Sequence, residues 1–142
     1  MSAFNQFEVE YVVVGAHAVN AYTQPRSTKD LDILISNSPE NAVRVFHALA
    51  HFGAPLAGYT PDLFSGKPDT CFQIGVEPDR IDILQSIEGV DFLTAWNGAQ
   101  LSTLAGVPVR VLSREHLIQN KLTVGRPRDL GDVDELRKFS EK

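Results

Sequence analysis

Three aspartates on two short apolar segments are the residues best placed to do chemistry in this chain. Asp30 and Asp32 alternate with apolar residues in the run 30–35, and Asp82 lies between two isoleucines in the run 81–84. In a β-strand, alternate side chains project from the same face, so Asp30 and Asp32 are expected to point together, roughly 6.5–7 Å apart. An unpaired carboxylate in an apolar strand is unfavourable, so Asp82 needs a cation, another partner or solvent.

Carboxylate oxygens are the ligands that Mg²⁺ prefers, and Mg²⁺ sites of this kind suit substrates that carry phosphate. If the two segments are neighbouring strands, Asp30, Asp32 and Asp82 converge and can hold one or two divalent ions, Mg²⁺ or Mn²⁺ in its place. Asp82 is then expected to bind a second metal or to act as the base for an attacking hydroxyl. The alternatives are a solvated strand edge for the pair and an ion pair with Arg80 for Asp82.

A glycine turn precedes the two aspartates of the first segment. The run 11–14 is apolar and mostly β-branched, and Gly15 ends it where a helix over 16–22 is expected. Backbone N–H groups at such a turn can bind an anion, and glycine permits a close approach. Gly15 and Ala16 are therefore expected to hold phosphate. Arg26 is expected either to bind phosphate or to pair with one of the aspartates.

The positions of proline, glycine and capping residues predict where the helices and strands of the chain begin and end. Strands are expected over 11–14, 31–35, 71–76, 81–84 and 107–111, and helices over 16–22, 39–52, 91–97, 114–124 and 127–136. Residues 54–69 are expected to be loop, and 77–80 a hairpin turn. Hairpins mixed with crossovers predict an α/β (α+β) fold, in which helices pack against a mixed β-sheet.

Composition bounds the class of protein. At 142 residues, the range 1–142 is expected to be one domain. A net charge of −5 argues against broad DNA binding, although 110–128 is locally basic, with five Lys and Arg residues against one acid. Cys71 is the only cysteine, which excludes an internal disulfide and a thiolate zinc site. No apolar run reaches the roughly 20 residues of a membrane span, and Met1–Phe7 is not a signal peptide, so a cytoplasmic protein without membrane contact is expected.

The order of these features resembles the nucleotidyltransferase superfamily of DNA polymerase β type. The resemblance rests on Gly15, Ala16, Arg26, Thr28, Asp30, Asp32 and Asp82. The runs 117–121 and 125–132 extend it to the small bacterial group related to AbiEii-type toxins and minimal nucleotidyltransferase antitoxins. In all, it covers about 11–136, nearly the whole chain.

The resemblance implies the nucleotidyltransferase fold and an enzyme that uses Mg²⁺ and a nucleoside triphosphate (NTP). Such an enzyme transfers a nucleoside monophosphate to a hydroxyl of RNA, protein or a small molecule, and releases pyrophosphate. A tRNA or a partner protein is the acceptor to consider first. The alternative is a non-catalytic or regulatory component of a toxin–antitoxin pair that acts by binding a partner protein. A homodimer formed through an exposed sheet edge is a further possible assembly.

The matching positions carry the roles that the resemblance implies. Asp30 and Asp32 match the metal-binding pair, and Asp82 matches the third acid, which helps to deprotonate the acceptor. Gly15 and Ala16 match the element that holds the triphosphate. Ala16 stands where glycine or serine is usual, so that the backbone N–H is kept but the serine hydroxyl is not.

Further residues match the family outside the three acids. Lys121 matches a helix lysine of the AbiEii-like group and is expected at the catalytic site, near phosphate; its alternative is a surface lysine. Asp129 and Asp132 match acidic positions of the C-terminal motif, and Asp129 is expected at the nucleotide unless it only caps the last helix. Thr28 and Arg26 complete the predicted nucleotide-binding set, with a turn hydroxyl as the alternative for Thr28.

Overall fold

The computed structural model of this chain describes residues 1–24, 30–75 and 80–138. Its helices are α1 (Ser2–Gln6), α2 (Gly15–Asn20), α3 (Pro39–Phe52), α4 (Phe92–Gly98), α5 (Arg114–Val124) and α6 (Pro127–Lys138), with a 3-10 turn, η1 (Pro61–Phe64). Its strands are β1 (Tyr11–Val14), β2 (Asp30–Ile35), β3 (Cys71–Ile74), β4 (Arg80–Leu84), β5 (Gln100–Leu104) and β6 (Val107–Val111).

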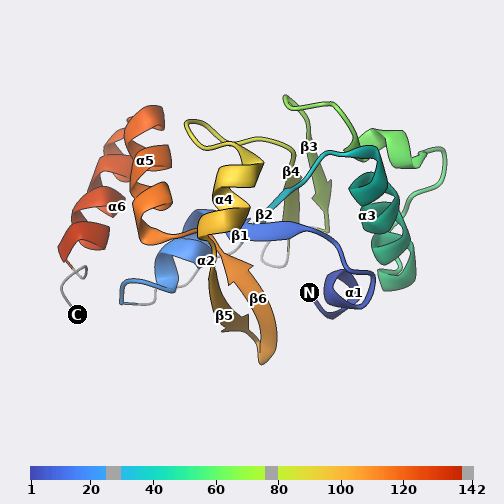
Figure 1. The fold of residues 1–142 in the computed structure, drawn as a ribbon, viewed down its shortest axis with the longest axis horizontal. Coiled ribbons are helices and arrows are strands. Elements are labelled where there is room, and N and C mark those ends of the chain that lie inside the picture. The colour runs from blue at the N-terminus through green and yellow to red at the C-terminus, as the bar shows by residue number, and fades with distance from the viewer. Residues whose placement is uncertain (25–29, 76–79, 139–142) are drawn as a thin grey trace.

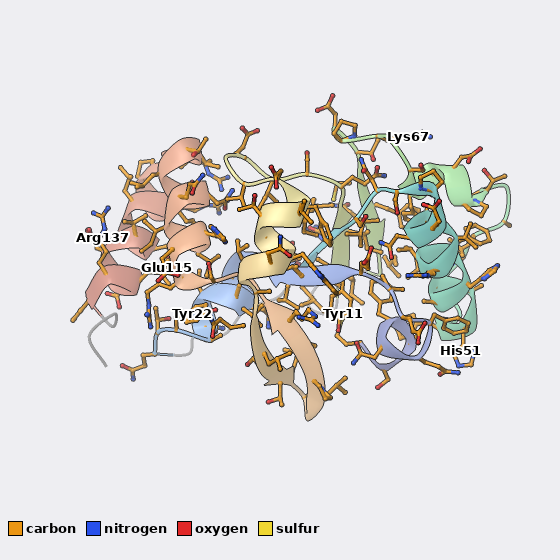
Figure 2. All side chains as sticks on the ribbon, viewed as in Figure 1. Tyr11, Tyr22, His51, Lys67, Glu115 and Arg137 are labelled. Atoms are coloured by element: carbon orange, nitrogen blue, oxygen red, sulfur yellow. The ribbon has the colours of Figure 1, made fainter. Side chains whose placement is uncertain are left out.

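The strands form one mixed sheet in the order β3-β4-β2-β1-β6-β5. β1 pairs antiparallel with β2 and parallel with β6, and β2 pairs parallel with β4. The α5–α6 hairpin lies at one end of the molecule and α3 with α1 at the other, while the β5–β6 hairpin projects from the body (Figure 1). Figure 2 shows the same separation, with Glu115 and Arg137 at the first end and His51 at the second. The predicted mixed sheet with helices packed against it is confirmed.

The register of β2 against its neighbours brings the acidic residues together. Asp32 lies opposite Asp82 on β4, and Asp30 lies opposite Arg80. On the other side of β2, Val14 at the end of β1 lies opposite Asp32. Paired residues on adjacent strands project from the same face of a sheet, so one face carries the three acids beside the point where β1 ends.

Burial along β2 explains why its acidic end is open while its other end is rigid. Ile33, Leu34 and Ile35 are at most 1% exposed, whereas the three residues before them are half-buried. Both faces of the strand are therefore covered over 33–35. The aspartates stand where that cover stops, on a strand that core packing holds in place.

The helix boundaries follow the capping residues that the sequence offers. Ser38 accepts a hydrogen bond from the Asn41 N–H at 3.2 Å at the start of α3, and Ser113 accepts one from the His116 N–H at 3.2 Å at the start of α5. Gly125 ends α5 with φ of 73°. These are the usual capping chemistries of a hydroxyl at the N-terminus and a left-handed glycine at the C-terminus.

Several elements differ from the sequence prediction. β5 was not predicted because its residues, Gln100–Leu104, are mostly polar and exposed, and because the hairpin turn into β6 uses Ala105 and Gly106, both at positive φ, without an Asn-Gly or Asp-Gly signal. α1 and η1 were not predicted either. β3 ends at Ile74, because Gly75 takes a φ of 80°. The predicted turn over 77–80 lies mostly outside the described residues, and Arg80 opens β4.

None of the described helices is both long and apolar enough to cross a membrane.

Candidate active site at the start of strand β2

Arg80 links two of the three aspartates directly. Its Nε lies 2.9 Å from Asp82 Oδ1, and one terminal nitrogen lies 3.2 Å from Asp82 Oδ2 and 2.8 Å from Asp30 Oδ2. The side chains of Arg80 and Asp30 are 27% and 28% exposed, and that of Asp82 is 11% exposed. The guanidinium therefore engages both oxygens of Asp82 and bridges to Asp30 in a partly desolvated position, where charge-assisted hydrogen bonds are strong.

Asp32 carries the most perturbed charge of the site. Burial raises the pKa of Asp32 to about 6, the negative charges of Asp82 and Asp30 and a hydrogen bond with Asp82 add to the rise, and Arg80 opposes it. Crowded carboxyl groups resist simultaneous ionisation, so Asp32 takes up its proton at a higher pH than an ordinary aspartate does. The pKa of the Cys71 thiol on β3 is also raised, first by burial and then by Asp82 and Asp32, so the field of the acids extends to the sheet edge.

Gly15 is required by the position of Asp32. Gly15 has a φ of +69°, and a Cβ atom built on it would collide with Oδ2 of Asp32. The backbone of the turn thus passes directly over the carboxylate, an approach that a side chain would block. The predicted glycine turn is therefore beside the acid pair, and Ala16 follows it at the start of α2.

A cleft of about 680 Å³ separates this end of the sheet from the α5–α6 hairpin. The sheet side is lined by Val14, Gly15, Ala16, Asp30, Asp32 and Leu84, and the helical side by Asn120, Lys121, Arg126, Arg128, Asp129, Asp132 and Glu135, among others. One wall carries carboxylates and a glycine turn, and the other carries three cationic side chains interspersed with acids. Such a cleft can accommodate a metal ion together with a polyanionic ligand.

Lys121 is fixed on the helical wall by a network of ion pairs. Its Nζ lies 3.1 Å from Asp132 Oδ2 and 3.5 Å from Asp129 Oδ1, while Arg126 Nε lies 2.7 Å from Asp129 Oδ2. Asp129 is 1% exposed and also accepts a hydrogen bond from the Arg126 N–H at 3.3 Å. The hydrogen bond from Arg126, followed by the charge of Lys121, lowers the pKa of Asp129. Asp129 therefore orders the start of α6 and holds Lys121 at the cleft.

The predicted site residues fall into three groups in the structure. Asp30, Asp32, Asp82, Gly15 and Ala16 come together on the sheet side, and Lys121 and Asp129 lie across the cleft from them. The remaining two nucleotide-binding predictions, Arg26 and Thr28, lie outside the described residues.

The sequence indicated Arg80 only as a partner of Asp82, and the structure adds its bridge to Asp30. The matched spacing of Arg80-x-Asp82 and Asp30-x-Asp32 is the available signal. Using it requires the strand register, which joins residues 50 positions apart.

The donor set fits a single Mg²⁺ better than a dedicated cage of protein ligands. In the described part of the chain, no three His, Cys, Asp or Glu side chains are arranged to hold a metal ion. Mg²⁺ is commonly bound by one or two carboxylates, with substrate phosphates and water completing its shell. Asp30 and Asp32 on the cleft meet that requirement. The raised pKa of Asp32 reflects burial first and then the neighbouring negative charges, which a bound cation would compensate.

No protein-family model and no curated protein sequence matches the chain. Among solved structures, it resembles ANT(2'')-Ia in complex with adenylyl-2''-tobramycin, with a TM-score of 0.61 and 15% identity over 96% of this chain and 83% of that one. It also resembles the lincosamide antibiotic adenylyltransferase LnuA with lincomycin bound, with a TM-score of 0.59 and 14% identity over 96% and 91%. A protein of Thermotoga maritima assigned to the nucleotidyltransferases, TM1012, has a TM-score of 0.60 and 18% identity over 99% and 87%.

At these identities the likeness concerns the fold. The chain has the nucleotidyltransferase fold over nearly its whole length, as the sequence resemblance implied.

Proposed function

We propose that the protein is a metal-dependent nucleotidyltransferase that transfers a nucleoside monophosphate from an NTP to a hydroxyl group. The observation that carries this proposal is the position of Asp30 and Asp32 on the cleft of a nucleotidyltransferase fold, beside the Gly15 turn and with Asp82 opposite Asp32 on the neighbouring strand. The neighbouring folds of ANT(2'')-Ia with an adenylylated ligand and of the adenylyltransferase LnuA support it.

In the proposed reaction, the oxygen of the acceptor hydroxyl attacks the α-phosphorus of the NTP. The new oxygen–phosphorus bond replaces the bond from the α-phosphorus to the oxygen that bridges to the β-phosphate, and pyrophosphate leaves. The hydroxyl proton passes to Asp82, which acts as general base. Asp30 and Asp32 would hold Mg²⁺, which when bound neutralises phosphate charge and orients the triphosphate.

Charged residues on both sides of the cleft would position the NTP. Gly15, Ala16 and Lys121 all line the cleft. In the proposed complex, the backbone at Gly15 and Ala16 would face the phosphates beside Asp32, and Lys121 would approach them from α5. The ion pairs of Lys121 with Asp129 and Asp132 limit its rotamers, so little conformational entropy is lost when it meets a phosphate. Arg26 and Thr28 lie outside the described residues, and their contacts with the nucleotide remain part of the proposal.

The test is transfer of label from each of the four α-³²P-labelled NTPs with Mg²⁺, separately with bulk tRNA, with cell lysate, and with tobramycin or lincomycin as small-molecule probes. Label on RNA, on protein or on a small molecule identifies the acceptor class. We expect label in at least one arm, lost on addition of EDTA. Absence of label in every arm, together with absence of Mg-NTP binding, would contradict the proposal.

The second candidate is a partner-binding component of a toxin–antitoxin pair. β5 is an edge strand without a charged residue, Leu101 on it is 78% exposed, and Leu93 on α4 is 67% exposed. An uncharged edge strand that carries an exposed apolar side chain is suited to pairing with another chain. A stable complex with the product of the adjacent gene, without label transfer in any arm, would favour this candidate over the first.

A further inference from the structure

Arg80 is placed where a second cation of the acid cluster would have to bind. It contacts both oxygens of Asp82 and one oxygen of Asp30 at 2.8–3.2 Å. Asp82 is 8% exposed, and unlike Asp30 and Asp32 it is not among the residues that line the described cleft. Asp82 is therefore paired with the Arg80 guanidinium and is not among the side chains that face the cleft.

The backbone register of β2 and β4 holds Arg80 against Asp30 and Asp82. Arg80 and Asp30 are paired across parallel strands, and Arg80 and Asp82 are two residues apart on one strand, so backbone register fixes all three side chains on one face. A planar guanidinium with several donors in one fork can satisfy two carboxylates at once, which a lysine ammonium cannot match in geometry.

The formal charge of the acid cluster also favours a single divalent ion. Asp30, Asp32 and Asp82 with Arg80 sum to −2, so one divalent ion brings the four side chains to neutrality. A second divalent ion on Asp82 would have to lie close to the guanidinium, where like charges in a partly desolvated site repel.

We propose that Arg80 takes the place of the second metal ion, so that the loaded site holds one divalent cation, on Asp30 and Asp32, instead of two. Arg80 is then a positioning residue: it holds Asp82 in place for the acceptor and supplies the positive charge that a second ion would otherwise bring. This inference rests on the proposed nucleotidyltransferase function and deepens it.

The test counts bound Mn²⁺ per protein by electron paramagnetic resonance, with a saturating concentration of the α,β-methylene analogue of each of the four NTPs in turn, none of which can release pyrophosphate. The wild-type protein is expected to bind one Mn²⁺. Arg80→Gln removes the charge and is expected to bind two, whereas Arg80→Lys keeps the charge and is expected to remain at one. Arg110→Gln is the matched control, because Arg110 lies on β6 with its guanidinium 4.2 Å from the centre of the Trp96 ring, and one Mn²⁺ is expected there as well.

Two bound Mn²⁺ in the wild-type protein, or one in folded Arg80→Gln, would overturn the inference and leave the proposed function standing. If Arg80→Gln does not fold, the wild-type count decides alone. No bound Mn²⁺ in the wild-type protein would overturn the proposed function itself, so the two failures are distinguishable.

Discussion

At the residue scale, the site is defined by carboxylates that crowd one another and by a glycine that makes room for them. Asp32 has Asp82 beside it on β4, Gly15 above it, and a pKa raised to about 6. Period-2 spacing within one strand was sufficient to predict the Asp30 and Asp32 pair from the sequence. The bridge from Arg80 to Asp30 was beyond prediction, because side-chain geometry between strands depends on register.

Gly15→Ala should impair the site by displacing Asp32. The new Cβ would meet Asp32 Oδ2 and would also be strained at a φ of +69°. Since losing a group that orients a metal ligand typically costs about 10–100-fold in metal affinity, we expect Mg-NTP affinity to fall by about that factor. Gly66→Ala is the control, because Gly66 has a φ of +64° and nothing within 4 Å of an added Cβ. Both variants should lose about 1–2 kcal/mol of stability, but equal nucleotide affinity in the two would contradict the role of Gly15.

Asp32→Asn should stabilise the metal-free protein at neutral pH. The pKa of Asp32 is raised from 3.8 to about 6, so the folded state binds the proton more tightly, and stability falls as pH rises between those values. The asparagine variant escapes this loss and should be more stable at pH 7, by at most about 3 kcal/mol. Urea unfolding at pH 7 and at pH 4 or below measures it, and the difference should shrink at the lower pH. A variant less stable than wild type at pH 7 would show that ionised Asp32 does not destabilise the folded protein.

At the scale of elements, the strands and helices with strong local signals were predicted, and those with weak signals were not. The helices α3, α5 and α6 have capping residues, glycine stops or an N-terminal proline, and they form where expected. β5 forms because it pairs with β6, and such tertiary pairing overrides weak local propensity. The α5–α6 hairpin depends on Asp129, which both caps the start of α6 and forms ion pairs with Lys121 and Arg126. The sequence alone could not show that one residue has both roles.

Asp129→Asn should destabilise the α5–α6 hairpin by about 1–2 kcal/mol, because it removes the buried carboxylate that Lys121 and Arg126 share, while Lys121 keeps its ion pair with Asp132. The pKa of Asp129 is lowered in the folded state, so its contribution is complete above the ordinary value near 3.8 and is lost as pH falls through the folded value. The stability gap to wild type should therefore narrow below about pH 4. Asp134→Asn, on an exposed position of α6, should change stability by less than about 0.5 kcal/mol. A comparable loss of stability in both variants would show that the ion pairs of Asp129 do not stabilise the hairpin.

At the scale of the whole molecule, the sheet order brings together segments that are far apart in the sequence. β2 and β4 are adjacent although 44 residues lie between Ile35 and Arg80, and the α5–α6 hairpin closes the cleft from the far end of the chain. The resemblance of motifs predicted this fold, and the solved structures confirm it. The two walls of the cleft, one with the aspartates of the sheet and one with cations and acids of the helices, come together only when both ends of the chain are placed.

The measurement that tests the account most directly is calorimetric binding of each of the four Mg-NTPs to the wild-type protein and to Asp32→Ala. We predict that at least one NTP binds the wild-type protein in a Mg²⁺-dependent manner. Asp32→Ala removes a proposed Mg²⁺ ligand and should weaken this binding by about 100-fold or more, since losing even a group that only orients a metal ligand costs about 10–100-fold in metal affinity. Its thermal unfolding should show a folded protein. Undiminished Mg-NTP binding in folded Asp32→Ala, or no Mg-dependent binding of any NTP to the wild-type protein, would contradict the assignment of this cleft as a nucleotidyltransferase active site.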